Sequence, residues 1–203
     1  MMARIGVLPG TFNPITAAHV AMARSALNFV DEVVFALPRE LPHKQYSGAS
    51  FDERVALLRA VAGEEPRFSV ATPEGGLFID IAAELRAGRG AETRLSFICG
   101  RDAAERIVGW DYGERSALIK ILLRDFDWLV AARDGEYSPP PDIAEWIEPL
   151  PLDEEYQRMS ATQVREKIAR GEPWEHMVPD AIHRQVRLIY APTEPAPDSL
   201  PGT

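Results

Sequence analysis

The sequence predicts a doubly wound α/β domain, in which a mostly parallel sheet carries helices on both faces. Short apolar runs alternate with segments of helical period along most of the 203 residues, which is the pattern of such a sheet. A tight turn at residues 10–16 directly follows the first apolar run, and α/β sheets bind phosphates at such turns. Beyond about residue 150, the only regular segments have helical period, at residues 162–169 and 181–189. We therefore expect a Rossmann-like doubly wound parallel sheet with a C-terminal helical piece.

The expected strands are short and rich in Val, Ile, Leu and Phe, and they cover residues 4–8, 32–38, 67–71, 94–99 and 128–131. The expected helices repeat apolar residues at spacings of three and four, as Val55, Leu58 and Val61 do. They cover residues 17–27, 51–62, 79–86, 116–123, 162–169 and 181–189, and Gly88 is expected to end the third of them. A proline-rich connection at residues 138–141 leads toward the C-terminal piece.

A chain of this length suits one domain, and we expect it to span residues 1–190, with the helical part at about residues 150–190. The tail from Pro192 onward contains four prolines and few apolar residues. Such a composition cannot bury a core, so we expect residues 191–203 to be disordered.

The composition excludes several classes of protein. A net charge of −9 and a pI of about 5.0 argue against a general nucleic-acid or membrane-surface binder, which is usually basic. No segment approaches the roughly 20 apolar residues of a membrane span, and the N-terminus lacks the pattern of a signal peptide. We therefore expect a cytoplasmic protein. The single cysteine, Cys99, ends an apolar strand and is expected to be buried and inert.

The first turn combines features of a phosphate site. Gly10 allows close approach of a ligand to the backbone, and Pro14 stiffens the turn. Thr16 can cap the following helix, whose first turn contains His19. A protonated histidine is disfavoured at the positive end of a helix unless an anion lies beside it. The purely structural alternative is a neutral, hydrogen-bonded histidine in an ordinary capped helix.

A second candidate phosphate site begins the helix near residue 161. Ser160 and Gln163 form an S-x-x-Q capping box, which by itself has a structural explanation. That explanation does not use Thr162 or Arg165. A hydroxyl, a guanidinium and the free N–H groups of a helix start together suit a polyphosphate.

Both segments resemble signatures of the nucleotidyltransferase superfamily. Residues 10–19, G-T-F-N-P-I-T-A-A-H, resemble G-x-F-D-P-x-(H/T)-x-G-H, with Asn13 in place of Asp and Ala18 in place of Gly. Residues 160–165, S-A-T-Q-V-R, resemble the end of I-S-S-T-x-x-R, with Ala161 in place of the middle serine.

Segments between and beyond these signatures resemble the nicotinate and nicotinamide mononucleotide adenylyltransferases. Residues 41–44, L-P-H-K, resemble the P-P-H-K segment of that family, and residues 97–102, F-I-C-G-R-D, resemble F-I-x-G-x-D. Residues 78–81, F-I-D-I, correspond to T-I-D-T with two matches. Trp110 resembles the tryptophan of L-x-x-W, residues 130–133 resemble V-x-x-R-P, and residues 177–182 resemble L-V-P-x-x-V. The resemblance runs from about residue 4 to about residue 190.

This resemblance implies transfer of the adenylyl group of ATP to a pyridine mononucleotide, with Mg²⁺ travelling with ATP. It implies catalytic roles for His19, Thr16 and Arg165. It implies ATP binding by Gly10, Thr11, Phe12, Ser160, Thr162, Gly100 and Asp102. It implies mononucleotide binding by Lys44, Asp80, Trp110 and Arg133, where Trp110 can stack on the pyridine ring and Lys44 can neutralise the phosphate. Self-association is common among folds of this family and is left open here.

Three alternatives remain at this point. Phe78 replaces a threonine that lies near the nicotinate carboxylate in acid-preferring enzymes, so the preference between nicotinate and nicotinamide stays open. Thr16 also suits a pantetheine-phosphate adenylyltransferase, although that family lacks the matches at residues 41–44 and 177–182. The substitutions Asn13, Ala18 and Ala161, together with Phe78 and Ile81, suit a non-catalytic nucleotide-binding regulatory protein.

Overall fold

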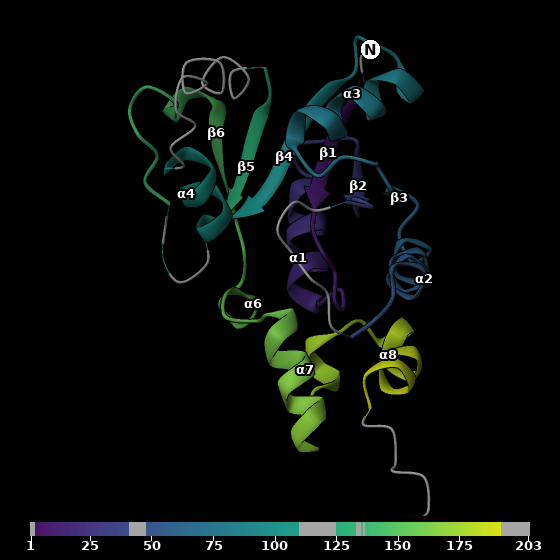
Figure 1. Ribbon diagram of the computed structural model, residues 1–203. Helices are drawn as coiled ribbons and strands as arrows, with labels where there is room; N and C mark the ends of the chain where they lie inside the picture. Colours follow the sequence, from purple (N-terminus) through teal and green to yellow (C-terminus); the bar gives the residue numbers. More distant parts are fainter. Residues whose placement is uncertain (1–2, 41–47, 110–124, 133–134, 136, 192–203) are drawn as a thin grey trace, which may run out of the picture.

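The computed structural model describes residues 3–40, 48–109, 125–132, 135 and 137–191. Within these ranges, one sheet of six parallel strands has the order β3-β2-β1-β4-β5-β6 (Figure 1). The strands are β1 (Arg4–Pro9), β2 (Glu32–Ala36), β3 (Phe68–Ala71), β4 (Arg94–Gly100), β5 (Asp127–Ala131) and β6 (Ile147–Leu150). The strand order reverses between β1 and β4, and ligands bind beyond the carboxyl ends of the strands at such a switch point. The expected doubly wound parallel sheet is confirmed.

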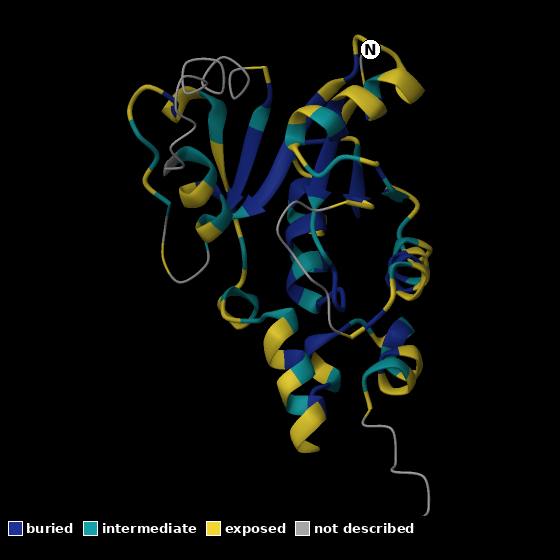
Figure 2. Cartoon of the chain, viewed as in Figure 1, coloured by how far each residue is buried: buried dark blue, intermediate teal, exposed yellow. Residues whose placement is uncertain are grey.

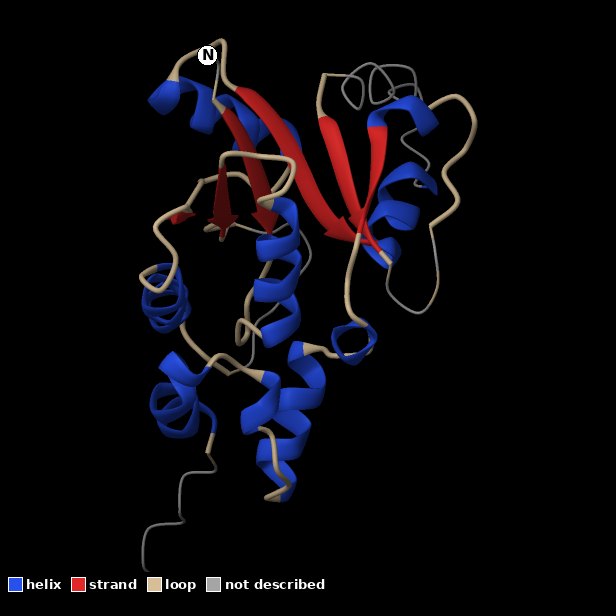
Figure 3. Cartoon of the chain, turned by 180° about the vertical axis from the view of Figure 1, so that it is seen from behind, coloured by secondary structure: helices blue, strands red, loops and turns tan. Residues whose placement is uncertain are grey.

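Helices follow the strands in alternation. They are α1 (Ala17–Ala26), α2 (Phe51–Ala62), α3 (Phe78–Arg89), α4 (Arg101–Gly109), α6 (Glu154–Gln157), α7 (Ala161–Arg170) and α8 (His183–Tyr190), with short 3₁₀ turns η2 (Ala144–Trp146), η3 (Glu175–Met177) and η4 (Asp180–Ile182). The strand arrows point toward the end of the molecule that holds α7 and α8 (Figure 1). In the view from behind, the helices again flank the sheet (Figure 3). None of the described helices is long and apolar enough to cross a membrane.

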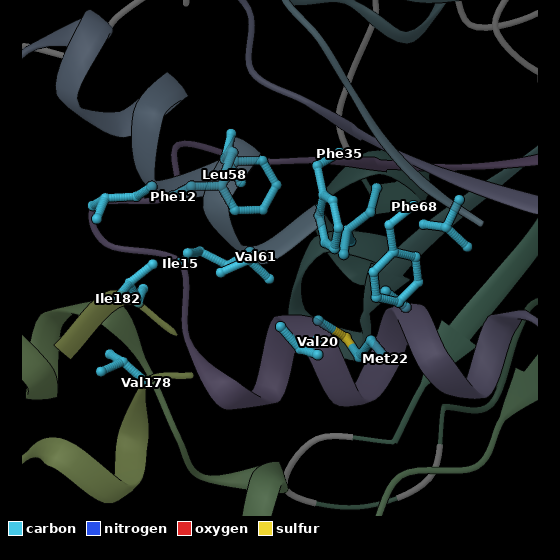
Figure 4. Close-up of a cluster of buried hydrophobic side chains, with 14 of the residues drawn as sticks. Phe12, Ile15, Val20, Met22, Phe35, Leu58, Val61, Phe68, Val178 and Ile182 are labelled. Carbon is cyan, nitrogen blue, oxygen red and sulfur yellow. The ribbon is translucent and has the colours of Figure 1, made fainter. Parts of the chain in front are cut away.

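Alternating strand residues build two apolar clusters, one on each face of the sheet. Val33 and Phe35 of β2 belong to a cluster with α1, α2 and the C-terminal helices, whereas Val34 of β2 belongs to a second cluster with α3 and α4. This alternation is the two-residue period of a strand that is buried on both faces. The inner strands β1, β2, β4 and β5 are accordingly mostly buried, and the outer helix faces are exposed (Figure 2). Residues of the first cluster are shown in Figure 4.

Several sequence-based expectations need correction. The helix expected at residues 79–86 runs to Arg89 and ends at Gly90, whose φ of +109° suits glycine, so Gly88 does not end it. The segment expected as one helix at residues 181–189 is divided into η4 and α8. The elements α4, β6 and α6 were not expected. The helix expected at residues 116–123 and the tail from residue 192 lie outside the described residues.

Candidate active site

The turn between β1 and α1 lies at the switch point of the sheet. The Gly10 N–H donates to the carbonyl of Ala36 at the end of β2, at 3.0 Å. Phe12 has a φ of +44°, a left-handed conformation that is uncommon for a bulky residue, and its ring is buried. A Cβ atom on Gly10 would approach the Phe12 ring to 2.9 Å. Glycine at this position therefore makes room for the ring that closes the turn.

Thr16 and His19 cap α1 reciprocally. The His19 N–H donates to the Thr16 hydroxyl at 3.4 Å, and the Thr16 N–H donates to Nδ1 of the His19 ring at 3.0 Å. A backbone N–H can only donate, so Nδ1 must be the unprotonated acceptor nitrogen. In the neutral ring the proton then lies on Nε2, so this nitrogen is a donor at the positive end of the helix.

Aromatic packing fixes the plane of the His19 ring. The Phe12 ring contacts His19 edge to face, with ring centroids 5.2 Å apart, and also contacts Phe35 of β2 at 5.9 Å. Phe12 and Thr16 are buried, whereas His19 is half-buried. The site therefore combines an anchored imidazole with access from outside.

The start of α7 meets this turn across 152 residues of sequence. The Arg165 Nη1 donates to the carbonyl of Asn13 at 2.6 Å, and Nη2 donates to the Thr162 hydroxyl at 3.3 Å. Ser160 and Gln163 form the expected capping box, with the Gln163 N–H 3.2 Å from the Ser160 hydroxyl. Two helix N-termini thus share one region, and the guanidinium of Arg165 lies between them.

Two residues of this region were missed by sequence reasoning. The buried Arg54 of α2 donates from Nη1 to the carbonyl of Thr11 at 2.9 Å and from Nε to the carbonyl of Ser50 at 3.3 Å. The Tyr190 hydroxyl donates to Oδ1 of Asn13 at 2.6 Å. A sequence signal existed for Arg54, because it lies on the apolar face of a predicted helix beside Val55. No local pattern points to Tyr190, which acts across 177 residues.

At two positions, Asn13 and Ala18, the chain differs from the signature that it resembles, and the structure gives each difference a local explanation. Aspartate and asparagine both present an Oδ1 acceptor, so Asn13 keeps the oxygen that Tyr190 requires. Ala18 is 2% exposed and belongs to the buried core. Its methyl group therefore occupies protein interior.

Gly100 and Asp102 lie at the carboxyl end of β4. The register that pairs Val7 of β1 with Phe97 of β4 brings the ends of these two strands side by side. Asp102 is exposed in the first turn of α4, which begins directly after Gly100. Beside it, Arg101 forms an ion pair with Glu105 at 3.2 Å.

The start of α3 holds Asp80 and Phe78. A Cβ atom on Gly75 would come within 2.6 Å of the Asp80 side chain, so this glycine allows the carboxylate to fold back over the preceding loop. The Phe78 ring contacts Phe97 and Trp128, with centroids 4.5 Å and 5.0 Å apart. Phe78 thus packs toward the sheet. The residue that precedes α3, Leu77, offers no side-chain hydrogen bond to cap the helix.

The remaining expected residues, Lys44, Trp110 and Arg133, lie outside the described residues. Among the described residues, no group of three or more His, Cys, Asp or Glu side chains could hold a metal ion. The expected burial of Cys99 is confirmed, and burial raises the pKa of its thiol to about 12. Such a thiol is a poor nucleophile at neutral pH.

Two cavities in the described part of the chain have linings that contain neither His19 nor Arg165. One, of about 660 Å³, follows the outer face of α1 and is lined by Arg24, Tyr156 and Asp180 among others. The other, of about 450 Å³, lies at the carboxyl ends of β5 and β6 beside Ala132 and Tyr137.

Comparison with known proteins identifies similar sequences along most of the chain. The family model described as "Cytidylyltransferase-like" matches residues 7–167. A relative from Moorella thermoacetica named "Probable nicotinate-nucleotide adenylyltransferase" is 28% identical, covering 93% of this chain and 92% of its own. A relative of the same name from Gloeobacter violaceus is 29% identical, covering 88% and 91%.

Solved structures share the fold. The nicotinic acid mononucleotide adenylyltransferase of Plasmodium falciparum complexed with NaAD has a TM-score of 0.67 and 18% identity, covering 90% of this chain and 95% of that one. The same enzyme complexed with APC has a TM-score of 0.65 over the same shares. At this identity the likeness concerns the fold.

Proposed function

The chain belongs to the cytidylyltransferase-like family, and from the relatives it resembles along most of its length we propose that it is a nicotinate-nucleotide adenylyltransferase. It joins the AMP moiety of ATP to nicotinate mononucleotide and releases pyrophosphate, a step of NAD biosynthesis. Relatives that match nearly the whole chain carry the name of this activity.

One observation carries the proposal. The Thr16 N–H fixes Nδ1 of His19 as an acceptor, so Nε2–H is a donor at the start of α1, in the same region as the Arg165 guanidinium. A neutral donor, a cation and two helix N-termini together favour a polyphosphate that gains charge on one oxygen. Transfer of the adenylyl group from ATP requires such an arrangement, because negative charge develops on the phosphate oxygens during the reaction.

The reaction needs no covalent intermediate. An oxygen of the mononucleotide 5′-phosphate attacks the α-phosphorus of ATP in line, and the bond from that phosphorus to the oxygen bridging to the β-phosphate breaks. The attacking phosphate is already ionised at neutral pH, so a strong general base is not required. Catalysis then consists of positioning and stabilisation of negative charge.

The residues divide this work between the two helix starts. His19 donates from Nε2 to oxygens of the α-phosphate, and the buried Thr16 fixes the imidazole ring in the orientation this requires. Ser160, Thr162 and Arg165 hold the β- and γ-phosphates and stabilise the leaving pyrophosphate. Mg²⁺ enters bound to ATP, as part of the substrate.

The acceptor side is proposed from the resemblance and from α3. Lys44, Trp110 and Arg133 bind the mononucleotide together with Asp80. Phe78 has no hydroxyl group, and its ring packs against Phe97 and Trp128, so its side chain cannot replace the threonine hydroxyl of the related signature. We therefore assign recognition of the nicotinate carboxylate to backbone N–H groups in the first turn of α3, where no side chain caps the helix.

We also propose that residues 1–190 act as one nucleotidyltransferase domain. The first apolar cluster runs without interruption from the sheet through α1 and α2 to α7 and α8, which supports this assignment.

The test is pyrophosphate release from ATP and Mg²⁺ with four acceptor conditions: nicotinate mononucleotide, nicotinamide mononucleotide, 4′-phosphopantetheine and none. We expect turnover with the pyridine mononucleotides, fastest with nicotinate. If 4′-phosphopantetheine is the only acceptor that supports turnover, the proposal is wrong and the protein is a pantetheine-phosphate adenylyltransferase. ATP binding without pyrophosphate release under all four conditions favours a regulatory nucleotide-binding protein.

A further inference from the structure

The hydroxyl group of Tyr190 joins three segments that are distant in sequence. Tyr190 is the last residue of α8, and its hydroxyl donates to Oδ1 of Asn13 in the β1–α1 turn at 2.6 Å. The same hydroxyl interacts with the backbone of Ala49, just before α2. One oxygen atom thus connects the C-terminal helix, the turn and the segment that leads into α2.

Gly48 shows how closely these segments fit. Its φ is +101°, which favours glycine, and a Cβ atom there would lie 3.2 Å from Oδ1 of Asn13 and 3.2 Å from Cε1 of Tyr190. The backbone beside Ala49 therefore lies directly against the hydrogen-bonded pair, and a side chain would press on both partners.

Asn13 passes this constraint to the proposed ATP site. Its side chain accepts the hydrogen bond from Tyr190, while its backbone carbonyl accepts the hydrogen bond from Arg165 at 2.6 Å. Rotation of the Asn13 peptide would move the carbonyl that orients the guanidinium. The neighbouring carbonyl of Thr11 is held by Arg54, so the turn is fixed on both sides of Phe12.

The Tyr190 hydroxyl remains a donor in this setting. Burial raises the pKa of Tyr190 well above its ordinary value, and this effect exceeds the opposing influence of Arg165 and Arg54. The group is therefore protonated throughout the pH range of an enzyme assay and can always donate to Asn13.

Building on the proposed function, we propose that Tyr190 is a positioning residue for adenylyl transfer. Its hydroxyl fixes Asn13, and Asn13 in turn orients Arg165 toward the phosphates of ATP. Tyr190 itself does not touch the substrate, because its hydroxyl is engaged with Asn13 and the Ala49 backbone.

The test is Tyr190→Phe, which removes one oxygen atom and keeps the packed ring. We expect kcat to fall about tenfold, the rate equivalent of one hydrogen bond, while KM for nicotinate mononucleotide keeps its wild-type value. Tyr156→Phe is the matched control, because Tyr156 is a partly buried tyrosine on α6 outside the turn, and it should leave both constants unchanged.

A double-mutant cycle separates positioning from general destabilisation. Asn13→Ala breaks the same hydrogen bond from the other side, so the double variant should be no slower than the slower single variant. Additive losses, or an unchanged kcat in Tyr190→Phe, overturn the positioning role and leave the proposed function intact. A loss of rate that only matches the unfolded fraction in a melting curve overturns it as well. A wild-type protein without pyrophosphate release overturns both proposals.

Discussion

At the scale of single residues, the proposed chemistry depends on which ring nitrogen of His19 carries the proton. The Thr16 N–H donates to Nδ1, and the Thr16 hydroxyl lies 2.7 Å from the same nitrogen. Protonation of Nδ1 would remove the acceptor that this N–H needs, so the capping box itself favours the neutral ring with Nε2–H. The structural and functional interpretations of this histidine are therefore compatible, because the hydrogen bonds that cap α1 also place the proton on Nε2.

The first prediction concerns His19→Ala. Removing a charge-stabilising donor from a transition state typically lowers kcat by about 10²–10³-fold, and we expect a loss of that size. Initial rates of pyrophosphate release measure it. His176→Ala is the control, because His176 is exposed in η3 and should leave kcat unchanged. Wild-type turnover in His19→Ala would contradict the role assigned to Nε2.

The helix caps of the site could be found from the sequence because their partners are local. Thr16 and His19 lie three positions apart, as do Ser160 and Gln163, and this spacing identifies a helix cap without knowledge of the fold. Arg54 and Tyr190 contact the turn across 43 and 177 residues. Only folding brings such partners together, so no sequence spacing links either residue to the turn, although the position of Arg54 on the apolar face of a predicted helix is a signal in itself.

At the scale of elements, the strands that were predicted are mostly apolar, whereas Glu148 and Pro149 separate the two apolar residues of β6. It reads Ile-Glu-Pro-Leu and lies at the edge of the sheet. Pro149 cannot donate to a neighbouring strand, and proline in a run argues against a strand unless that strand is an edge. The edge position is known only after the sheet is assembled. The helix α4 follows β4 without a connecting residue, so no turn signal separates the two.

The end of α3 supports a second prediction. Gly88 is helical with nothing within 4 Å of a Cβ atom, so Gly88→Ala should stabilise the protein by about 0.5–1 kcal/mol. Gly90 has equally open space but a φ of +109°, so Gly90→Ala should destabilise it. Thermal unfolding of the two variants gives the comparison. A stabilising Gly90→Ala would show that backbone conformation does not decide where this helix ends.

A third prediction concerns Glu32, which ties β2 to β3 and α3. The Arg89 guanidinium donates to Glu32 at 2.7 Å, and Ser69 also donates to this carboxylate. The hydrogen bond from Arg89 is the largest cause that lowers the pKa of Glu32, and the bond from Ser69 adds to it, while burial opposes them. The folded state therefore binds fewer protons at this site than the unfolded state does.

The sign of the pH effect follows from that lowered pKa. The stabilisation is present above the unfolded pKa of about 4.5 and is lost as the pH falls through the folded pKa. Glu32→Gln should thus melt below wild type at pH 7, and the difference should shrink in acid. The control is Glu92→Gln at an exposed glutamate before β4. A difference in melting temperature between Glu32→Gln and wild type that stays constant from pH 7 to pH 3 would exclude this linkage.

At the scale of the whole molecule, one apolar cluster connects the sheet to the C-terminal helices. Ile15 of the β1–α1 turn belongs to the same cluster as Val178 and Ile182, and Figure 4 shows these three side chains near one another. Phe12, which packs against the His19 ring, is also a member. The packing that fixes the β1–α1 turn is therefore the packing that attaches α7 and α8.

Cooperative unfolding follows from this shared cluster and gives the last prediction. Ile182 is fully buried, so Ile182→Ala should destabilise the protein by about 2–5 kcal/mol through lost burial and the cavity left behind. Leu188 of α8 is 75% exposed, and Leu188→Ala should change stability by no more than about 0.5 kcal/mol. Because sheet and C-terminal helices share one core, urea should unfold Ile182→Ala in a single transition that coincides when followed by tryptophan fluorescence and by circular dichroism. Two separated transitions would mean that the C-terminal helices form a unit of their own, and Arg165 would then reach the ATP site from a part of the chain that can detach while the sheet remains folded.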